Sequence, residues 1–152
     1  MGQQTLIYGY ISGSSWKTSD YFKLHRLNEN VIAGIPEMDQ DNELPYINRS
    51  MFAVPNRQGT YQQQPIAFGA AYKTLEYEWH LWLDKFEGIL RQLFWWEAKI
   101  HVQFELMGEY VCEWKADYGK FLDENWDKPE TEELTPIQDW TFKSDAPRKF
   151  DL

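Results

Sequence analysis

Residues 76–96 read EYEWHLWLDKFEGILRQLFWW and decide how this chain folds. Four of these residues are tryptophan, yet acidic and basic residues recur through the stretch at nearly every turn. The apolar side chains fall three or four positions apart, which is the spacing of one broad face of an amphipathic helix. They are Leu75, Trp79, Trp82, Leu83, Phe86, Ile89, Leu90, Leu93 and Phe94. We therefore expect a helix that buries this face at the centre of the fold.

The same helix is not expected to enter a membrane. A transmembrane helix needs about 20 mostly apolar residues, and charges interrupt this one. A helix that lies in the membrane interface carries lysine and arginine on its polar face, whereas acids predominate here. The face opposite the apolar one is expected to carry Glu76, His80, Asp84, Glu87 and Arg91.

Segments on both sides of this helix predict β-strands. Residues 98–106 alternate apolar and polar side chains, which is typical of a strand with one buried and one exposed face. Residues 110–114 return after a turn and complete a hairpin. The earlier segments 5–11, 50–54 and 65–72 are rich in β-branched and aromatic residues, which favour strands.

A first helix is expected to begin at about Ser19 and to end at Gly34, so the predicted order is β-α-β-β-α-β-β. This order predicts an α+β fold: one antiparallel sheet of about five strands with two helices on one face, in the ferredoxin-like arrangement. Residues 1–143 are expected to form a single domain, with 116–143 as a tail that wraps it, because aromatic residues recur there. Residues 144–152 are expected to be mobile.

The formal net charge of −9 is concentrated in two short stretches. Residues 37–43 carry −4 and residues 123–133 carry −5, while the rest of the chain balances. An acidic surface repels the phosphate backbone of nucleic acids but attracts and steers basic proteins. We expect a basic protein partner and no nucleic acid. The plainer interpretation, in which both stretches are solvated loops, stays open.

Candidate catalytic residues are few. Glu76, His80 and Asp84 are spaced by four residues and could form a carboxylate–His–carboxylate row, although a solvated helix face is the simpler interpretation. His101 and Glu105, on the outer face of a strand, are interpreted in the same way. A lone Cys112 on a strand is more often a small buried side chain than a nucleophile. We therefore expect no catalytic residue, no metal, no cofactor and no enzymatic activity.

In size, acidity and aromatic content the chain resembles the immunity proteins that neutralise bacterial toxins, many of which are basic nucleases. This resemblance implies a non-enzymatic inhibitor that binds a basic toxin domain. It rests on no motif, so no residue role is transferred. Tight inhibition needs aromatic anchors surrounded by complementary charge. The candidate partner-binding residues are Glu37, Asp39, Asp41, Glu43, Trp95, Trp96, Asp123, Glu124, Trp126, Asp127 and Glu130.

Two other functions stay open. The chain could be a ligand- or carbohydrate-binding domain that stacks exposed tryptophan or tyrosine rings on its ligand. It could also be a hydrolase-like enzyme that uses one of the histidines named above. The N-terminal residues show no secretory signal, and a single cysteine cannot form an internal disulfide. We therefore expect a cytoplasmic protein, and the resemblance to immunity proteins implies a bacterial one.

Overall fold

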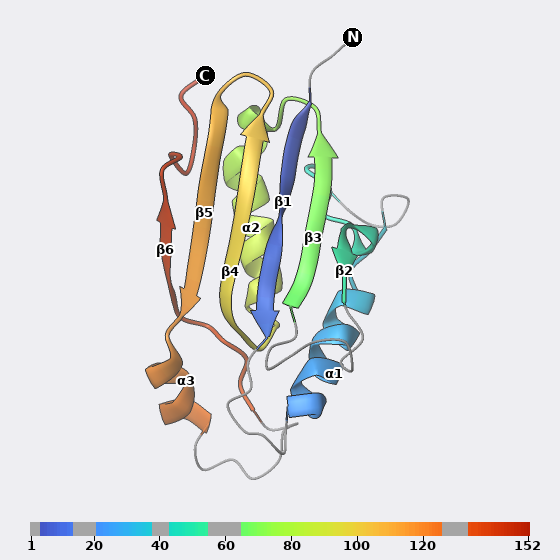
Figure 1. The fold of residues 1–152 in the computed structure, drawn as a ribbon, viewed down its shortest axis with the longest axis vertical. Coiled ribbons are helices and arrows are strands. Elements are labelled where there is room, and N and C mark those ends of the chain that lie inside the picture. Colours follow the sequence, from blue (N-terminus) through green and yellow to red (C-terminus); the bar gives the residue numbers. More distant parts are fainter. Residues whose placement is uncertain (1–3, 14–20, 38–42, 55–64, 126–133) are drawn as a thin grey trace.

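A computed structural model of the chain describes residues 4–13, 21–37, 43–54, 65–125 and 134–152. These residues form an α+β fold with a single open antiparallel sheet of six strands and three α-helices (Figure 1). The elements are β1 (Thr5–Gly13), α1 (Tyr21–Ala33), η2 (Arg49–Met51), β2 (Phe52–Ala53), β3 (Pro65–Tyr72), η4 (Leu75–Glu78), α2 (Trp79–Leu90), β4 (Trp95–Phe104), β5 (Gly108–Ala116), α3 (Tyr118–Asn125) and β6 (Trp140–Ser144), where η marks a 3-10 helix.

The strand order across the sheet is β2-β3-β1-β4-β5-β6, and each neighbouring pair is antiparallel. The predicted α+β class is confirmed. The sheet has six strands rather than about five, because Trp140–Ser144 pairs with β5 at the edge of the sheet. That segment was expected only to wrap the domain.

Helix α2 lies behind the sheet in Figure 1 and packs its aromatic face against the inner side of the strands. All nine apolar residues predicted for this face are buried, as expected, but the helix is shorter than predicted: Leu75 lies in η4, and Leu93 and Phe94 follow the end of α2. The rings of Trp79, Trp82 and Phe86 stack in sequence, with centroids 5.3 and 5.0 Å apart. Phe68 from β3 and Trp114 from β5 contact this stack from the sheet. Each such buried side chain contributes about 1.5–3 kcal/mol of transfer free energy.

The predicted polar side of this helical region requires a correction, because two of its carboxylates are buried. Glu76 is 2% exposed and accepts hydrogen bonds from Thr5 Oγ1 (3.4 Å) and the Leu106 N–H (2.7 Å). Glu87 is 6% exposed and accepts a hydrogen bond from Trp114 Nε1 (2.9 Å). Partners from distant parts of the chain satisfy both carboxylates, and the helical period of the sequence cannot reveal such partners.

Helix α1 is attached to the connection between α2 and β4 by one buried side chain. The Asn28 amide donates to the Phe94 carbonyl (2.8 Å), and the Phe94 N–H donates back to Asn28 Oδ1 (2.9 Å). This reciprocal pair satisfies both main-chain groups of a residue just before β4.

The described helices include none that is both long enough and apolar enough to span a membrane.

The C-terminal residues pack on the domain. The Phe150 ring is buried 5.0 Å from the ring of Phe104. Arg148 forms ion pairs with Asp84 (3.1 Å) and Glu87, and its hydrogen bond to Glu87 is the largest cause of a raised Arg148 pKa. Whether residues 144–152 move in solution stays a prediction.

We expect Arg148→Ala to lower the free energy of unfolding by about 1–2 kcal/mol, because it removes the charged partner of a buried carboxylate. The partial exposure of Arg148 keeps the effect below that of a fully buried pair. Urea denaturation monitored by tryptophan fluorescence measures it. Lys149→Ala, at the exposed neighbouring position, is the control and should change little. Equal stabilities of the two variants would contradict this role for Arg148.

Gly9 of β1 lies against the backbone of β4 and leaves no room there for a side chain. A methyl group at this position would overlap the Lys99 carbonyl oxygen and lie 2.7 Å from Ile100 Cα. Gly69, on the neighbouring strand β3, has no atom within 4 Å of the same position. The centre of the sheet therefore requires glycine in β1 and tolerates a side chain in β3.

We expect Gly9→Ala to destabilise the protein by about 1–3 kcal/mol, because strand β1 or β4 must shift to admit the methyl group. Gly69→Ala is the matched control and should remain within about 0.5 kcal/mol of the wild type. Thermal unfolding of the two variants provides the comparison. A Gly9→Ala protein as stable as Gly69→Ala would show that the two backbones are not in such close contact.

Candidate partner-binding surface

The first acidic stretch is partly neutralised by its surroundings. Glu37 accepts hydrogen bonds from Arg49 Nε (3.2 Å) and Ser50 Oγ (3.3 Å), so its charge is paired. Glu43 is exposed, and the ammonium group of Lys85 contacts its backbone carbonyl. Asp39 and Asp41 lie outside the described residues.

The second acidic stretch begins on α3. Asp123 and Glu124 are both exposed there, so they are available to a partner. The other predicted residues of this stretch, Trp126, Asp127 and Glu130, lie outside the described residues.

The two adjacent tryptophans at the start of β4 have different environments. Trp95 is 1% exposed, and its indole N–H donates to the Leu90 carbonyl (2.9 Å). Trp96 is partly exposed. Trp95 is therefore part of the core and cannot reach a partner from its position in the folded chain.

The sheet does not bring the described parts of the two acidic stretches together. Glu37 is tied to η2, which leads into the edge strand β2. Helix α3 is held near the opposite edge, because Asp117 N–H donates to the Asp139 carbonyl (2.8 Å) immediately before β6. Six strands spaced about 4.8 Å apart separate the two edges by roughly 24 Å. Glu37 and the acids on α3 therefore do not form one patch.

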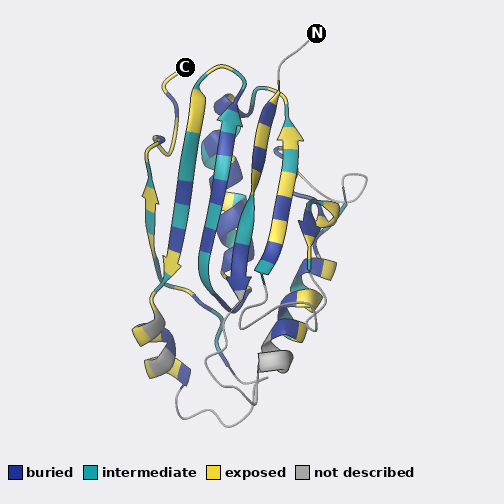
Figure 2. Cartoon of the chain, viewed as in Figure 1, coloured by how far each residue is buried: buried dark blue, intermediate teal, exposed yellow. Residues whose placement is uncertain are grey.

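The structure reveals a surface that sequence reasoning missed: the outer face of the sheet, opposite α2. None of the described helices covers it (Figure 1). Buried and more exposed residues alternate along β1 and β3 (Figure 2), as expected where successive side chains point to opposite faces. Leu6 is 37% exposed and Tyr8 is 47% exposed on β1. The Tyr8 ring stacks on His101 of β4, with centroids 5.2 Å apart and planes 6° from parallel.

Neighbouring strands extend this outer face in register. Leu6 pairs with Gln103, which pairs with Glu109 of β5, while Tyr8 pairs with His101, which pairs with Val111. On the other side of β1, strand β3 presents only small exposed residues. They are Ala67, Gly69 and Ala71. The exposed leucine and tyrosine of β1 therefore lie beside a strip of small residues on β3.

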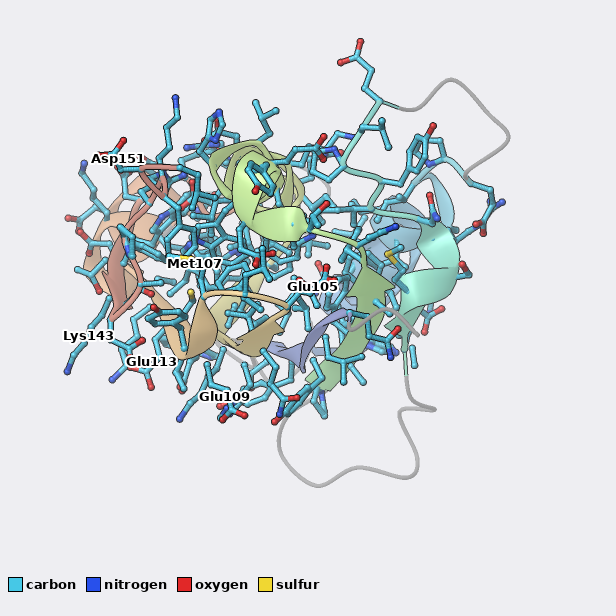
Figure 3. All side chains as sticks on the ribbon, turned by 90° about the horizontal axis from the view of Figure 1, so that it is seen from above. Glu105, Met107, Glu109, Glu113, Lys143 and Asp151 are labelled. Carbon is cyan, nitrogen blue, oxygen red and sulfur yellow. The ribbon has the colours of Figure 1, made fainter. Side chains whose placement is uncertain are left out.

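A shallow hollow of about 540 Å³ lies at the end of this face where β4 turns into β5. Two carboxylates, Glu105 of the turn and Glu109 near the start of β5, are among the residues around it, and Figure 3 shows this end of the molecule from above. Leu106 is 62% exposed beside them. The lining residues are Gln4, Gln103, Phe104, Glu105, Leu106, Gly108 and Glu109.

Hydrogen bonds fix the turn that forms the hollow. Glu105 Oε2 accepts a hydrogen bond from the Thr74 N–H (3.1 Å), and the Glu105 N–H donates to Thr5 Oγ1 (3.2 Å). Buried Glu76 holds the next residue, Leu106, through its N–H. Thr74 itself has a left-handed backbone with φ of 50°. The turn between β4 and β5 is thus anchored to the start of β1 and to the chain leaving β3.

A second hollow, of about 410 Å³, lies between α1 and α2. Its apolar lining includes Val31, Ile35 and Ile89, and Lys85 lies at its side. Burial lowers the pKa of Lys85, which donates hydrogen bonds to the carbonyls of Glu43 and Pro45. This lysine is already engaged with the backbone of the linker.

The candidate catalytic residues are not assembled into one site. Glu76 is buried against Thr5 and Leu106, whereas Asp84 is exposed and pairs with Arg148, so the predicted row with His80 does not share one face. His101 stacks on Tyr8. Over the described ranges, no group of three or more His, Cys, Asp or Glu residues is placed to hold a metal ion.

Comparison of the chain with protein-family models, with curated proteins and with solved structures finds no match.

The thiol of Cys112 is expected to be chemically inert in the folded protein. The thiol is buried, and its Sγ lies 3.2 Å from Ser144 Oγ. Burial raises the pKa of this thiol from 9.0 to about 11. At pH 8 such a shift leaves about a hundredfold less thiolate, which is the reactive form.

We expect iodoacetamide to label native Cys112 at least a hundredfold more slowly than the urea-unfolded chain. Comparable rates would show that the thiol is exposed or ionised.

This raised pKa also has a consequence for stability at alkaline pH. Folding favours the neutral thiol of Cys112. Its contribution to the free energy of unfolding is therefore complete below pH 9 and is lost as pH rises towards 11.

Proposed function

We propose that this chain is a non-enzymatic acidic interaction protein, an immunity-type inhibitor that binds and neutralises a basic bacterial toxin domain such as a nuclease. The observation that carries the proposal is the outer face of the sheet, which none of the described helices covers. Exposed apolar side chains there lie beside carboxylates, on strands whose other side is fully packed.

This combination suits the binding of a basic protein. Exposed Leu6, Tyr8 and Leu106 offer apolar contact area, while Glu105 and Glu109 offer opposite charge to a cationic surface. Protein interfaces draw most of their affinity from a few such apolar anchors, and complementary charge adds specificity and association rate. The net charge of −9 would steer a basic partner towards the molecule.

We also infer a ferredoxin-like core and a cytoplasmic location. The four strands β4-β1-β3-β2 lie side by side in this order, with α1 following β1 and α2 following β3 in the chain. Strands β5 and β6 would then extend that core beyond β4. A cytoplasmic inhibitor would meet the toxin in the cell that makes it.

A carbohydrate- or ligand-binding function is the second candidate, because the same face carries tyrosine rings. Tyr8 is exposed and stacked on His101, and the Tyr10 hydroxyl donates to Glu97 (3.4 Å). Aromatic rings beside polar groups suit the stacking of a sugar or another planar ligand. In this case Tyr8→Ala would abolish binding, whereas neutralising nearby acids would have little effect.

The decisive experiment is an affinity pull-down of the tagged full chain from a lysate of its host, at low and at moderate salt. We expect a basic protein to remain bound at moderate salt in an equimolar complex. When that protein is purified or expressed alone, its activity should be toxic and should be suppressed by this chain. A captured protein whose activity is unaffected would contradict the inhibitor function, and glycan-dependent capture would favour the second candidate.

A further inference from the structure

We propose that the basic partner docks on the outer face of the sheet, placing an arginine or lysine in the hollow beside Glu105 and Glu109 and an apolar side chain on Leu6 and Tyr8. This inference rests on the proposed function and assigns it a surface different from the two acidic stretches.

The charges around the hollow fit a cationic side chain. Two carboxylates, Glu105 and Glu109, and two amides, Gln4 and Gln103, line it, and its lining residues include no base. On the same face the nearest lysine along β4 is Lys99, which pairs with Glu113 of β5 (3.3 Å). A guanidinium or ammonium group entering here would meet acceptors on both sides, and such charge-assisted hydrogen bonds are among the stronger polar contacts in proteins.

Apolar surface lies directly beside these acceptors. Leu6 is the cross-strand neighbour of Gln103, and Gln103 is the neighbour of Glu109, so the leucine adjoins the hollow in register. Tyr8 follows on the same face of β1. A partner with a basic residue next to an apolar one would cover both parts of this surface. The flat strip of Ala67, Gly69 and Ala71 would let a folded partner approach the sheet closely.

Hydrogen bonds hold the residues around the hollow in place. Glu76 is buried and holds the Leu106 N–H at 2.7 Å, while Glu105 is held through Thr74 and Thr5. A surface already fixed in shape loses little conformational entropy on binding. Of the described acids in the two acidic stretches, Glu37 and those on α3 lie near opposite edges of the sheet, and none of them lines the hollow.

Site-specific photo-crosslinking in the host cell tests the docking surface. A photoreactive amino acid replaces Leu106 in one full-length variant, Leu81 in a second and Glu124 in a third. Leu81 is the matched control, because it is an exposed leucine on α2, in the layer behind the sheet. We expect position 106 to crosslink to the same basic protein that the pull-down captures, and positions 81 and 124 not to do so.

Other crosslinking patterns have distinct meanings. Crosslinking at 81 or 124 but not at 106 overturns the docking surface and leaves the proposed function intact. A partner captured by the pull-down that crosslinks at none of the three positions also overturns the docking surface. A failed pull-down, without crosslinks, overturns the proposed function itself.

A pair of charge-matched double variants tests the role of the two carboxylates with the captured protein as the probe. Glu105→Gln/Glu109→Gln and Asp123→Asn/Glu124→Gln each remove two negative charges. We expect the first to weaken binding by about tenfold to a hundredfold in calorimetry and to flatten its salt dependence, and the second to weaken it by less than about threefold. Urea midpoints verify that both remain folded. Equal losses would mean that only net charge matters, and the proposal would fail.

Discussion

The stack of Trp79, Trp82 and Phe86 against the inner face of the sheet is the contact on which the rest of the structure depends. It packs one amphipathic helix against the strands and removes three large aromatic side chains from water. Because these residues lie on one side of the sheet, the aromatic core is one-sided. The outer face of the central strands is consequently left for exposed residues such as Leu6 and Tyr8.

Two buried carboxylates connect this core to its periphery. Glu76 links the start of the helical region to β1 and to the turn after β4. Glu87, in the following helix α2, accepts hydrogen bonds from both Trp114 of β5 and Arg148 of the C-terminal segment. A buried carboxylate is favourable only when donors surround it, so each glutamate selects one arrangement of the segments that supply those donors. The position of the β4–β5 turn, and with it the hollow at Glu105, follows from this requirement.

The arrangement separates the functions of the acidic residues. Some are structural, as Glu76 and Glu87 are, and some pair locally, as Glu37 does with Arg49. Those that line the outer face of the sheet adjoin exposed apolar side chains, and this combination of charge and apolar area is what a protein interface needs. Net charge alone would favour a basic partner without indicating where it binds.

Local sequence patterns determined the α+β class, the buried face of residues 75–94 and the alternating strand β4, because helical and strand periods are properties of neighbouring residues. They did not reveal that Glu76 and Glu87 are buried, that residues 140–144 form a sixth strand, or that Trp95 belongs to the core. Each of these depends on partners far away in the chain: the Glu105 N–H, for example, reaches Thr5, 100 residues earlier. The outer sheet face with its hollow was likewise decided by tertiary structure, since strand order and register brought Leu6, Gln103 and Glu109 side by side.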